Sequence, residues 1–414
     1  MQMDLLIRNA KIVGQGGLKN IAIEAGRITK IGKITKRARK TIDAGGMLVS
    51  SAFIDPHIHL DKVLIAEDLR PNVSGTLMEA IELIWERKRR YTVADVKRRA
   101  GEVISMAALN GTTRMRTHVD VDTIGGLMPL KGLLATRKEF KELMDLQIVA
   151  FPQEGIVRDP GTDELMRKAM ELGADLVGGM PHHERSHEEA KHHIDVAFNI
   201  AREFDANIDM HVDETDDPNS RSLEYLAEKT IAEGYQGRVT AGHTCALAAY
   251  PDDYAREVIR KVKLADINMI TNPATNLVIQ GRGDRQPIRR GITRVKELLA
   301  AGVNVTFGQD CVDDAFYPFG RADMLEVALI TAHAAQLTTP AEIEILFKMM
   351  TTNAARTLGV LDDYGIAVGK RADMIILDAE SPKDAIRRQV NRQYVIKDGR
   401  VIAESTSLRK LSKN

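Results

Sequence analysis

The chain has 414 residues, which is enough for a large barrel with a smaller appendage. Lys plus Arg and Asp plus Glu each total 58, so the charge balance gives no reason to expect nucleic acid as a partner. No run approaches the roughly 20 apolar residues of a membrane span, and Asp4 near the start is untypical of a signal peptide. With only two cysteines in the chain, we expect a cytoplasmic protein.

Both ends of the chain have the pattern of antiparallel strands. Residues 5–13 and 21–32 alternate apolar and polar positions around turns, and the same pattern returns at 372–377 and 394–401. We predict that segments 1–48 and 365–414 together form one small β-sandwich domain. Segment 49–364 would then be a separate domain inserted between its two halves.

The central segment alternates short apolar runs with longer amphipathic stretches, which is typical of repeated βα units. Eight units predict a (β/α)8 barrel, whose functional groups lie at the C-terminal ends of the strands. A doubly wound sheet is the alternative, but it does not explain why nearly every candidate functional side chain follows a strand end. The apolar runs end near residues 57–59, 118, 153, 181, 211–214, 243, 272 and 310.

Three histidines and one aspartate at these strand ends have the composition of a metal site. His57 and His59 are one residue apart on the first predicted strand, so their side chains point to the same face. His211 ends the fifth strand and Asp310 the eighth, and a barrel brings strands one and eight together. Three imidazoles and a carboxylate suit Zn²⁺ or Fe²⁺. We predict one divalent metal ion, although each histidine alone could equally be an interior hydrogen-bonded residue.

Further polar residues near this group are candidates for catalysis. A metal ion lowers the pKa of a bound water, which then acts as a nucleophile near neutral pH. Glu214 could transfer a proton between this water and the substrate, unless it is an exposed carboxylate of an acidic loop. His243 could stabilise a developing oxyanion, and Asp310 could accept a proton while remaining a ligand. We therefore predict Glu214, His243 and Asp310 as catalytic residues.

The other histidines are weaker candidates. His118 ends the second strand, where a role in supporting a ligand is the better interpretation. In the cluster around residues 182–193, His187 and His192 fall on different faces of the predicted helix. We expect a solvated helix start there, with His183 close enough to reach a substrate. The cluster consists of His182, His183, His187, His192 and His193.

The paired histidines, His211 with Glu214, His243 and Asp310 resemble the amidohydrolase superfamily. The phrases at 352–359 and 369–377 fit that superfamily too. Five further segments narrow the resemblance to bacterial cytosine deaminases, and the similarity extends from the first hairpin to about residue 400. These segments are 74–77, 116–121, 146–155, 289–297 and 317–318.

The resemblance implies one iron or zinc ion on His57, His59, His211 and Asp310, and hydrolytic deamination of an aminopyrimidine. Glu214 would protonate a ring nitrogen and then assist the loss of ammonia. His243 and Asp310 would orient and deprotonate the water.

The resemblance also implies substrate contacts by Gln153 and Leu77. The Gln153 amide would bind the pyrimidine carbonyl and ring nitrogen, because it offers both a donor and an acceptor. Where these deaminases usually have a second Asp and a Trp, this chain has Cys311 and Phe316. Cys is a small, weakly polar side chain, so we expect the pocket to accept or prefer 5-methylcytosine and 5-fluorocytosine. Unchanged specificity is the alternative.

Other functions would use the same residues. The metal and Glu214 would equally serve deamination of a triazine, a pterin or a purine such as isoguanine, or hydrolysis of a cyclic amide of the creatinine type. A non-catalytic barrel protein should have lost a ligand or this glutamate, and none is missing. We expect a homo-oligomer that binds a small nucleobase and neither nucleic acid nor a membrane.

Overall fold

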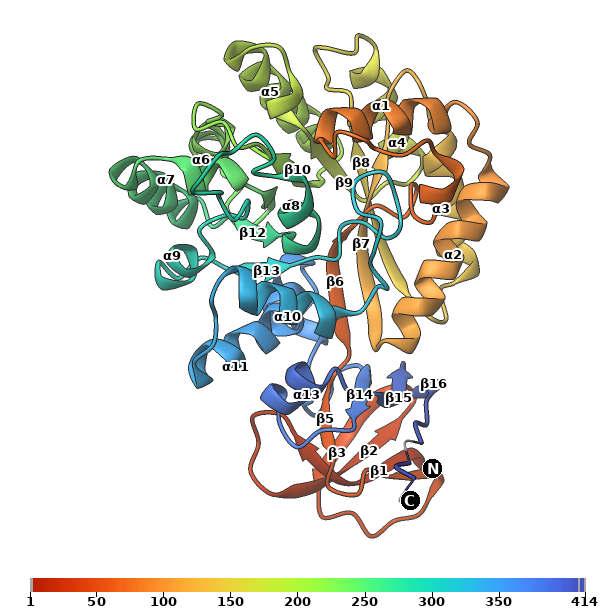
Figure 1. Ribbon diagram of the computed structural model, residues 1–414. Helices are drawn as coiled ribbons and strands as arrows, with labels where there is room; N and C mark the ends of the chain where they lie inside the picture. Colours follow the sequence, from red (N-terminus) through yellow and green to blue (C-terminus); the bar gives the residue numbers. More distant parts are fainter. Residues whose placement is uncertain (1–2, 409, 413–414) are drawn as a thin grey trace.

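The computed structural model describes residues 3–408 and 410–412, which form a barrel with a second sheet at one end (Figure 1). Eight parallel strands follow one another around the barrel in chain order. Burial on both faces explains their continuous apolar runs, because helices cover the outer face of a parallel sheet. The strands are β6 (Phe53–Ile58), β7 (Thr112–Asp120), β8 (Asp145–Phe151), β9 (Leu176–Gly179), β10 (Asn207–Val212), β11 (Val239–His243), β12 (Asn268–Thr271) and β13 (Val305–Phe307).

The first and last strands of this sheet meet and close it. Ile58 and Asp310 form a parallel bridge between the ends of β6 and β13. The Asp310 amide donates to the His57 carbonyl at 2.8 Å, and the His59 amide donates to the Asp310 carbonyl at 2.9 Å. The (β/α)8 barrel is therefore confirmed, and the doubly wound alternative is wrong.

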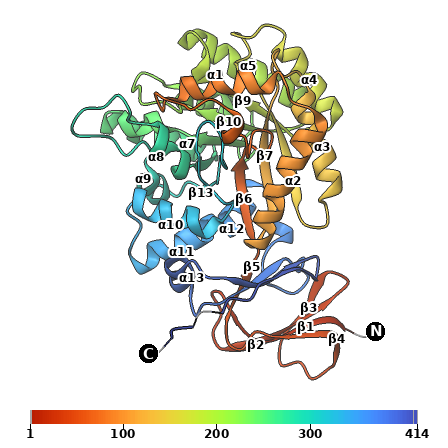
Figure 2. The same cartoon turned by 45° about the vertical axis from the view of Figure 1, so that its right-hand side comes forward.

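Helices surround the barrel (Figures 1 and 2). Several begin at a residue whose hydroxyl accepts a hydrogen bond from the first turn, as Thr76, Thr92 and Ser186 do, which satisfies an otherwise free amide. The helices are α1 (Leu77–Lys88), α2 (Val93–Leu109), α3 (Met128–Glu139), α4 (Thr162–Leu172), α5 (His187–Glu203), α6 (Ser222–Ala232), α7 (Asp252–Leu264), α8 (Pro273–Ile279), α9 (Val295–Ala300), α10 (Met324–Ala334), α11 (Pro340–Met349), α12 (Thr352–Thr357) and α13 (Pro382–Arg388).

The second sheet combines strands from both ends of the chain, as predicted, and it lies below the barrel in Figure 1. Its order is β16-β15-β14-β5-β1-β2-β3, and β4 also pairs with β1. The residue boundaries assigned to the two domains stay a prediction. The strands are β1 (Met3–Ile12), β2 (Leu18–Glu24), β3 (Arg27–Gly32), β4 (Ala38–Asp43), β5 (Leu48–Ser51), β14 (Met374–Leu377), β15 (Arg392–Lys397) and β16 (Arg400–Glu404).

The apolar run that precedes the paired histidines is divided between the two sheets. β5 pairs with β1 and β14 in the second sheet, and β6 begins the barrel. Between them lies Ala52, which is fully buried and donates its amide to the Asp373 carbonyl. In the sequence these residues look like one continuous apolar run, because the strands on both sides of Ala52 are buried. This short connection joins the two sheets directly.

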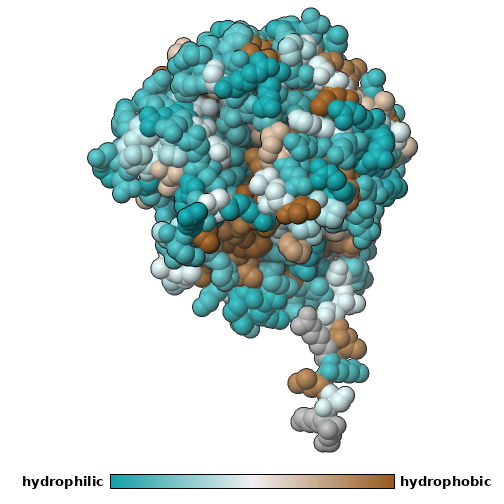
Figure 3. All heavy atoms as spheres, turned by 45° about the horizontal axis from the view of Figure 1, so that its top comes forward, coloured by the Kyte–Doolittle hydropathy of each residue, from teal (hydrophilic) through white to brown (hydrophobic). Residues whose placement is uncertain are grey.

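Hydrophilic side chains predominate on the face drawn in Figure 3. Among the described helices, none is both long enough and apolar enough to cross a membrane. The predicted cytoplasmic location and homo-oligomeric state stay predictions.

A buried arginine ties the barrel strands together from the inside. Arg116 on β7 is 1% exposed, and one of its terminal nitrogens donates to Asp209 on β10 at 2.8 Å. The rest of its guanidinium reaches the Gln147 side chain at 3.0 Å and the Thr357 carbonyl at 2.9 Å. Each of these groups is removed from water, so the arginine satisfies acceptors that have no easy replacement.

We expect Arg116→Met to lower the free energy of unfolding by about 3–5 kcal/mol, because it leaves the buried Asp209 carboxylate uncompensated. The matched control is Arg98→Met, since Arg98 is 64% exposed and pairs with Asp95 at the surface. That change should cost about 1 kcal/mol or less. Urea denaturation of both variants measures the difference, and equal losses would contradict a special role for the interior pair.

Candidate active site

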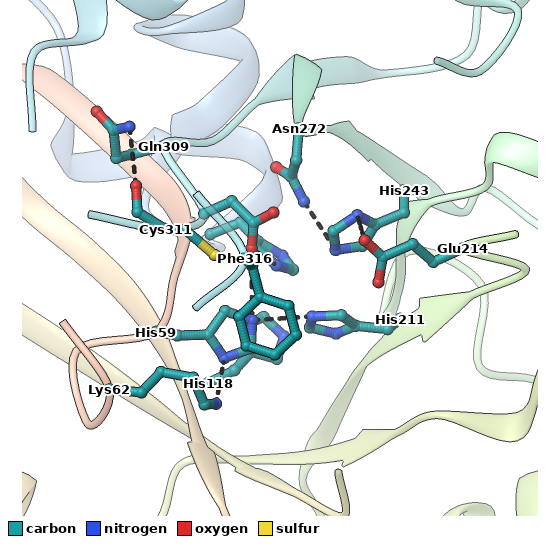
Figure 4. Close-up of polar contacts among 12 residues, drawn as sticks. His59, Lys62, His118, His211, Glu214, His243, Asn272, Gln309, Cys311 and Phe316 are labelled. Atoms are coloured by element: carbon teal, nitrogen blue, oxygen red, sulfur yellow. Dashed lines mark hydrogen bonds and ion pairs between the residues drawn. The ribbon is translucent and has the colours of Figure 1, made fainter. Parts of the chain in front are cut away.

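The four predicted metal-binding side chains converge at the C-terminal end of the barrel, and Figure 4 shows two of them, His59 and His211. One nitrogen or oxygen from each of His57, His59, His211 and Asp310 lies within 4.8 Å of the others, and all four residues are buried. The Nε2 atoms of His59 and His211 are 2.9 Å apart. The Asp310 Oδ1 lies 3.4 Å from His57 Nε2 and 3.5 Å from His59 Nε2. Strand closure thus brings together residues more than 250 positions apart in the sequence.

The free atoms of this group fit a cation. Both ring nitrogens of His57, the Nδ1 of His211 and the Oδ2 of Asp310 are buried without a hydrogen-bond partner among the described residues. Two imidazole nitrogens at 2.9 Å repel through their lone pairs unless a proton or a metal ion lies between them. The four residues therefore have the donor set and the unpaired atoms that a divalent ion requires.

The protonation states of the histidines favour metal binding. Burial, and next the neighbouring His118, lower the pKa of His57 to about 4. Burial is also the largest cause that lowers the pKa values of His59 and His211 well below the usual value. At neutral pH these rings are uncharged, and a neutral imidazole offers the lone pair that a metal binds.

Glu214 and His243 form a buried pair beside the metal-binding group. The Glu214 Oε1 is 3.0 Å from His243 Nδ1, and it also accepts a hydrogen bond from Asn276 at 3.0 Å. Asn272 lies 3.0 Å from the other ring nitrogen of His243 (Figure 4). Burial lowers the pKa of His243, but the carboxylates of Glu214 and Asp310 outweigh it and raise this pKa to about 9. Glu214 is 4% exposed, so the alternative of an exposed loop carboxylate is wrong.

One small cavity joins the predicted substrate contacts to these groups. Its free volume is about 20 Å³, which is room for little more than a water molecule. Of the predicted site residues, only His57 is absent from its wall. The wall consists of His59, Lys62, Leu77, Gln153, His211, Glu214, His243, Thr275, Asp310, Cys311 and Phe316.

Lys62, Thr275, Asn272 and Asn276 belong to this region but were not predicted. Lys62 Nζ lies 3.1 Å from His59 Nδ1 and 2.6 Å from Asp120 Oδ1. A signal was present in each case, because Lys62 closely follows His59 and the other three begin the segment after the seventh strand. In a barrel, a polar side chain that follows a strand is as strong a candidate for the active site as a histidine there.

The remaining histidines divide into two groups. The His118 ring lies 4.2 Å from the His57 ring, centre to centre, and its Nε2 is 3.3 Å from Asp209 Oδ1, so it packs behind a candidate ligand. His187 and His192 are exposed, as expected for a solvated helix start. That prediction is wrong for His193, which is fully buried because its ring fits between β9 and Glu184.

Comparisons with known proteins identify the class. The profile of the amidohydrolase family matches residues 40–403. N-isopropylammelide isopropyl amidohydrolase of Pseudomonas sp. strain ADP is 36% identical over 97% of both chains. Pterin deaminase of Rhizobium rhizogenes is 32% identical over 86% of this chain and 81% of the relative. The structure of 5-methylcytosine deaminase from Klebsiella pneumoniae liganded with 5-fluorocytosine is 39% identical, with a TM-score of 0.95, and covers 98% of this chain and 99% of that chain.

The chain belongs to the amidohydrolase family. It is accordingly a hydrolase of carbon–nitrogen bonds in a metal-dependent family, with a group of His and Asp residues that could hold a metal. The predicted resemblance to the amidohydrolase superfamily is therefore confirmed. The similarity to a 5-methylcytosine deaminase structure also supports the narrower resemblance to bacterial cytosine deaminases.

We expect His211→Ala to lose bound metal, because it removes one of only four converging donors. Glu214→Gln is the matched variant, since it changes a neighbouring carboxylate that is not one of these four donors. It should retain the metal content of the wild-type protein. Elemental analysis of purified protein measures both, and equal metal content in the two variants would contradict the assignment of His211.

Proposed function

We propose that the protein is a metal-dependent deaminase of aminopyrimidines of the cytosine class, with 5-methylcytosine among its best substrates. One observation carries this proposal: Gln153, Cys311 and Phe316 line the same cavity as Glu214 and the metal-binding group. The 39% identity to a 5-methylcytosine deaminase liganded with 5-fluorocytosine supports the choice of substrate.

Gln153 is suited to the carbonyl side of the pyrimidine. Its amide nitrogen lies 3.5 Å from Met180 Sδ, and sulfur is a weak acceptor. When the amide donates to a ring carbonyl, it gives up a weak acceptor, the Met180 sulfur, for a strong one. Its oxygen can accept from the adjacent ring N–H at the same time.

Cys311 and Phe316 give the far wall of the cavity an apolar character. Both are almost fully buried and belong to one hydrophobic cluster with Leu77 beside it. Burial raises the pKa of the Cys311 thiol well above its usual value, so the side chain is uncharged at neutral pH. A neutral thiol tolerates a methyl or fluorine at pyrimidine C5 better than a carboxylate does, because the carboxylate would lose hydration against it.

Glu214 carries the proton transfers. A divalent ion, which we infer to be iron or zinc, would be held by His57, His59, His211 and Asp310 and would supply Lewis acidity that lowers the pKa of a water. Glu214 takes a proton from the attacking water and delivers it to the ring nitrogen beside the amino-bearing carbon. It then carries the second water proton from the new hydroxyl group to the amino group, which leaves as ammonia, so one water is consumed, one C–O bond forms and one C–N bond breaks.

His243 holds Glu214 in place for these transfers. Its Nδ1 faces the carboxylate, and Asn276 donates to the same oxygen. These contacts leave the second oxygen, Oε2, free to face the substrate. The positive charge favoured on His243 also stabilises negative charge that develops beside it.

Hydrolysis of a triazine or deamination of a pterin is the second candidate. The relatives at 36% and 32% identity, an isopropylammelide amidohydrolase and a pterin deaminase, favour it.

We expect Glu214→Gln to reduce kcat by roughly 10²–10⁴-fold, because glutamine has the shape of the acid but cannot carry a proton. Steady-state ammonia release on metal-loaded protein measures the loss. Glu228→Gln, at a mostly exposed position on α6, is the matched control and should retain the wild-type rate. A Glu214→Gln variant with full turnover would remove this residue from the mechanism.

Ammonia release on a panel of cytosine, 5-methylcytosine, 5-fluorocytosine, ammelide-type triazines and pterins tests the substrate class. We expect 5-methylcytosine to have a kcat/KM at least equal to that of cytosine and up to about four-fold higher, since one buried methyl group contributes about 0.8 kcal/mol. Cys311→Asp should shift the ratio toward cytosine, and Cys245→Ala, outside this cavity, should leave it unchanged. Rejection of both 5-substituted bases, or faster turnover of a triazine or pterin, would overturn the assignment.

A further inference from the structure

A buried glutamate–histidine pair outside the cavity holds the loop that carries Gln153. Glu184 follows the short helix η2 (Pro181–His183), and His193 lies on α5. Both side chains are fully buried, with His193 Nδ1 2.7 Å from Glu184 Oε1. Neither residue lines the cavity. Taking a carboxylate out of water is costly unless its oxygens are well hydrogen-bonded. The partners of the buried Glu184 carboxylate therefore matter.

The Glu184 carboxylate binds the backbone of the loop after β8. Its Oε1 accepts from the amides of Ile156 at 2.7 Å and Val157 at 3.0 Å, and its Oε2 accepts from the amide of Arg158 at 2.8 Å. Three successive amides thus converge on one side chain. Burial alone would raise the pKa of Glu184, but His193 and these amides lower it, so the carboxylate is ionised.

His193 connects the same carboxylate to the sulfur partner of Gln153. The Met180 amide donates to His193 Nε2 at 3.0 Å. A backbone amide can only donate, so Nε2 carries no proton and Nδ1 donates its proton to Glu184. Met180 in turn offers its sulfur to the Gln153 amide at 3.5 Å. The Glu184–His193 pair therefore holds the backbone of the loop after β8. Through the Met180 amide it also holds the residue whose sulfur contacts Gln153.

A second anchor lies between Gln153 and the three loop amides. The next residue, Glu154, accepts from the buried Lys88 at 3.1 Å, and Lys88 also donates to Asp120 and Asp122. Gly155 has φ +89°, and a Cβ atom there would lie 2.8 Å from Glu184 Oε1. Only glycine allows this close approach without strain.

We propose that Glu184 and His193 are positioning residues for substrate recognition, which act by holding Gln153 at the edge of the pyrimidine ring. This inference rests on the proposed role of Gln153 in binding the substrate. The pair touches neither the metal-binding group nor Glu214, so its effect should reach the reaction through Gln153. Glu184→Gln replaces an acceptor oxygen by an NH₂ group that opposes the loop amides or the His193 proton.

A double-mutant cycle tests this route, with the best aminopyrimidine of the panel as substrate. Glu184→Gln should lower kcat/KM about ten- to hundred-fold, as expected for the loss of hydrogen bonds to a charged group. The loss should come mainly from a higher KM, and the metal content should be unchanged. In the Gln153→Ala background the same change should lower kcat/KM by less than about two-fold, because its target is already gone. Glu188→Gln, on the same helix as His193, should have no effect in either background, because Glu188 is exposed and pairs with Lys191.

Equal losses from Glu184→Gln in both backgrounds would overturn the proposal, because a general loss of stability does not depend on Gln153. A Gln153→Ala variant with wild-type kcat/KM would instead refute the substrate contact itself, and the positioning role with it. If Glu184→Gln does not fold, Gly155→Ala perturbs the same contact from the loop side and enters the same cycle. Additive effects of Gly155→Ala and Gln153→Ala would overturn the proposal in the same way.

Discussion

The closure of β13 onto β6 is the constraint on which the site depends. Two backbone hydrogen bonds join Asp310 to His57 and His59, so the metal-binding carboxylate and the paired imidazoles are held by main-chain geometry rather than by flexible side chains. His211 is added from the opposite part of the barrel on β10. A single strand register therefore determines whether these donors meet, and a shift of one residue would turn the paired histidines away from the barrel interior.

Burial then gives the converged groups their chemical states. It keeps the three metal-facing imidazoles neutral and the Cys311 thiol protonated, whereas the carboxylates beside His243 favour its charged form. The same low-dielectric surroundings make unpaired charges costly, which accounts for the network around Lys62 and Lys88 at the rear of the cavity. The candidate ligands keep free atoms, whereas the Lys62 and Lys88 ammonium groups are paired with carboxylates.

In the proposed function, recognition of the substrate is divided between two walls of the cavity. The wall at Gln153 is polar, and two buried contacts hold the loop that follows it, the ion pair of Glu154 with Lys88 and the bond from the Ile156 amide to Glu184. The wall at Cys311 and Phe316 is apolar and packs within a hydrophobic cluster. An isopropylammelide amidohydrolase and a pterin deaminase are similar to this chain in sequence, and a 5-methylcytosine deaminase has the same fold. Changes in these walls can alter the substrate while the metal-binding group stays the same.

The sequence by itself determined the barrel, the second sheet and the candidate ligands, because periodicity reports burial and because functional side chains follow strand ends in this fold. It did not reveal that the run before His57 divides between two sheets at Ala52, because the residues on both sides of this point are buried. Only the tertiary structure showed that Asn272 and Asn276 contact His243 and Glu214, that Lys62 reaches His59, and that His193 is buried against Glu184. Side-chain packing decides these contacts, both for residues distant in sequence, such as Glu214 and Asn276, and for near neighbours, such as His59 and Lys62. No local pattern records which polar groups will face each other once the barrel closes.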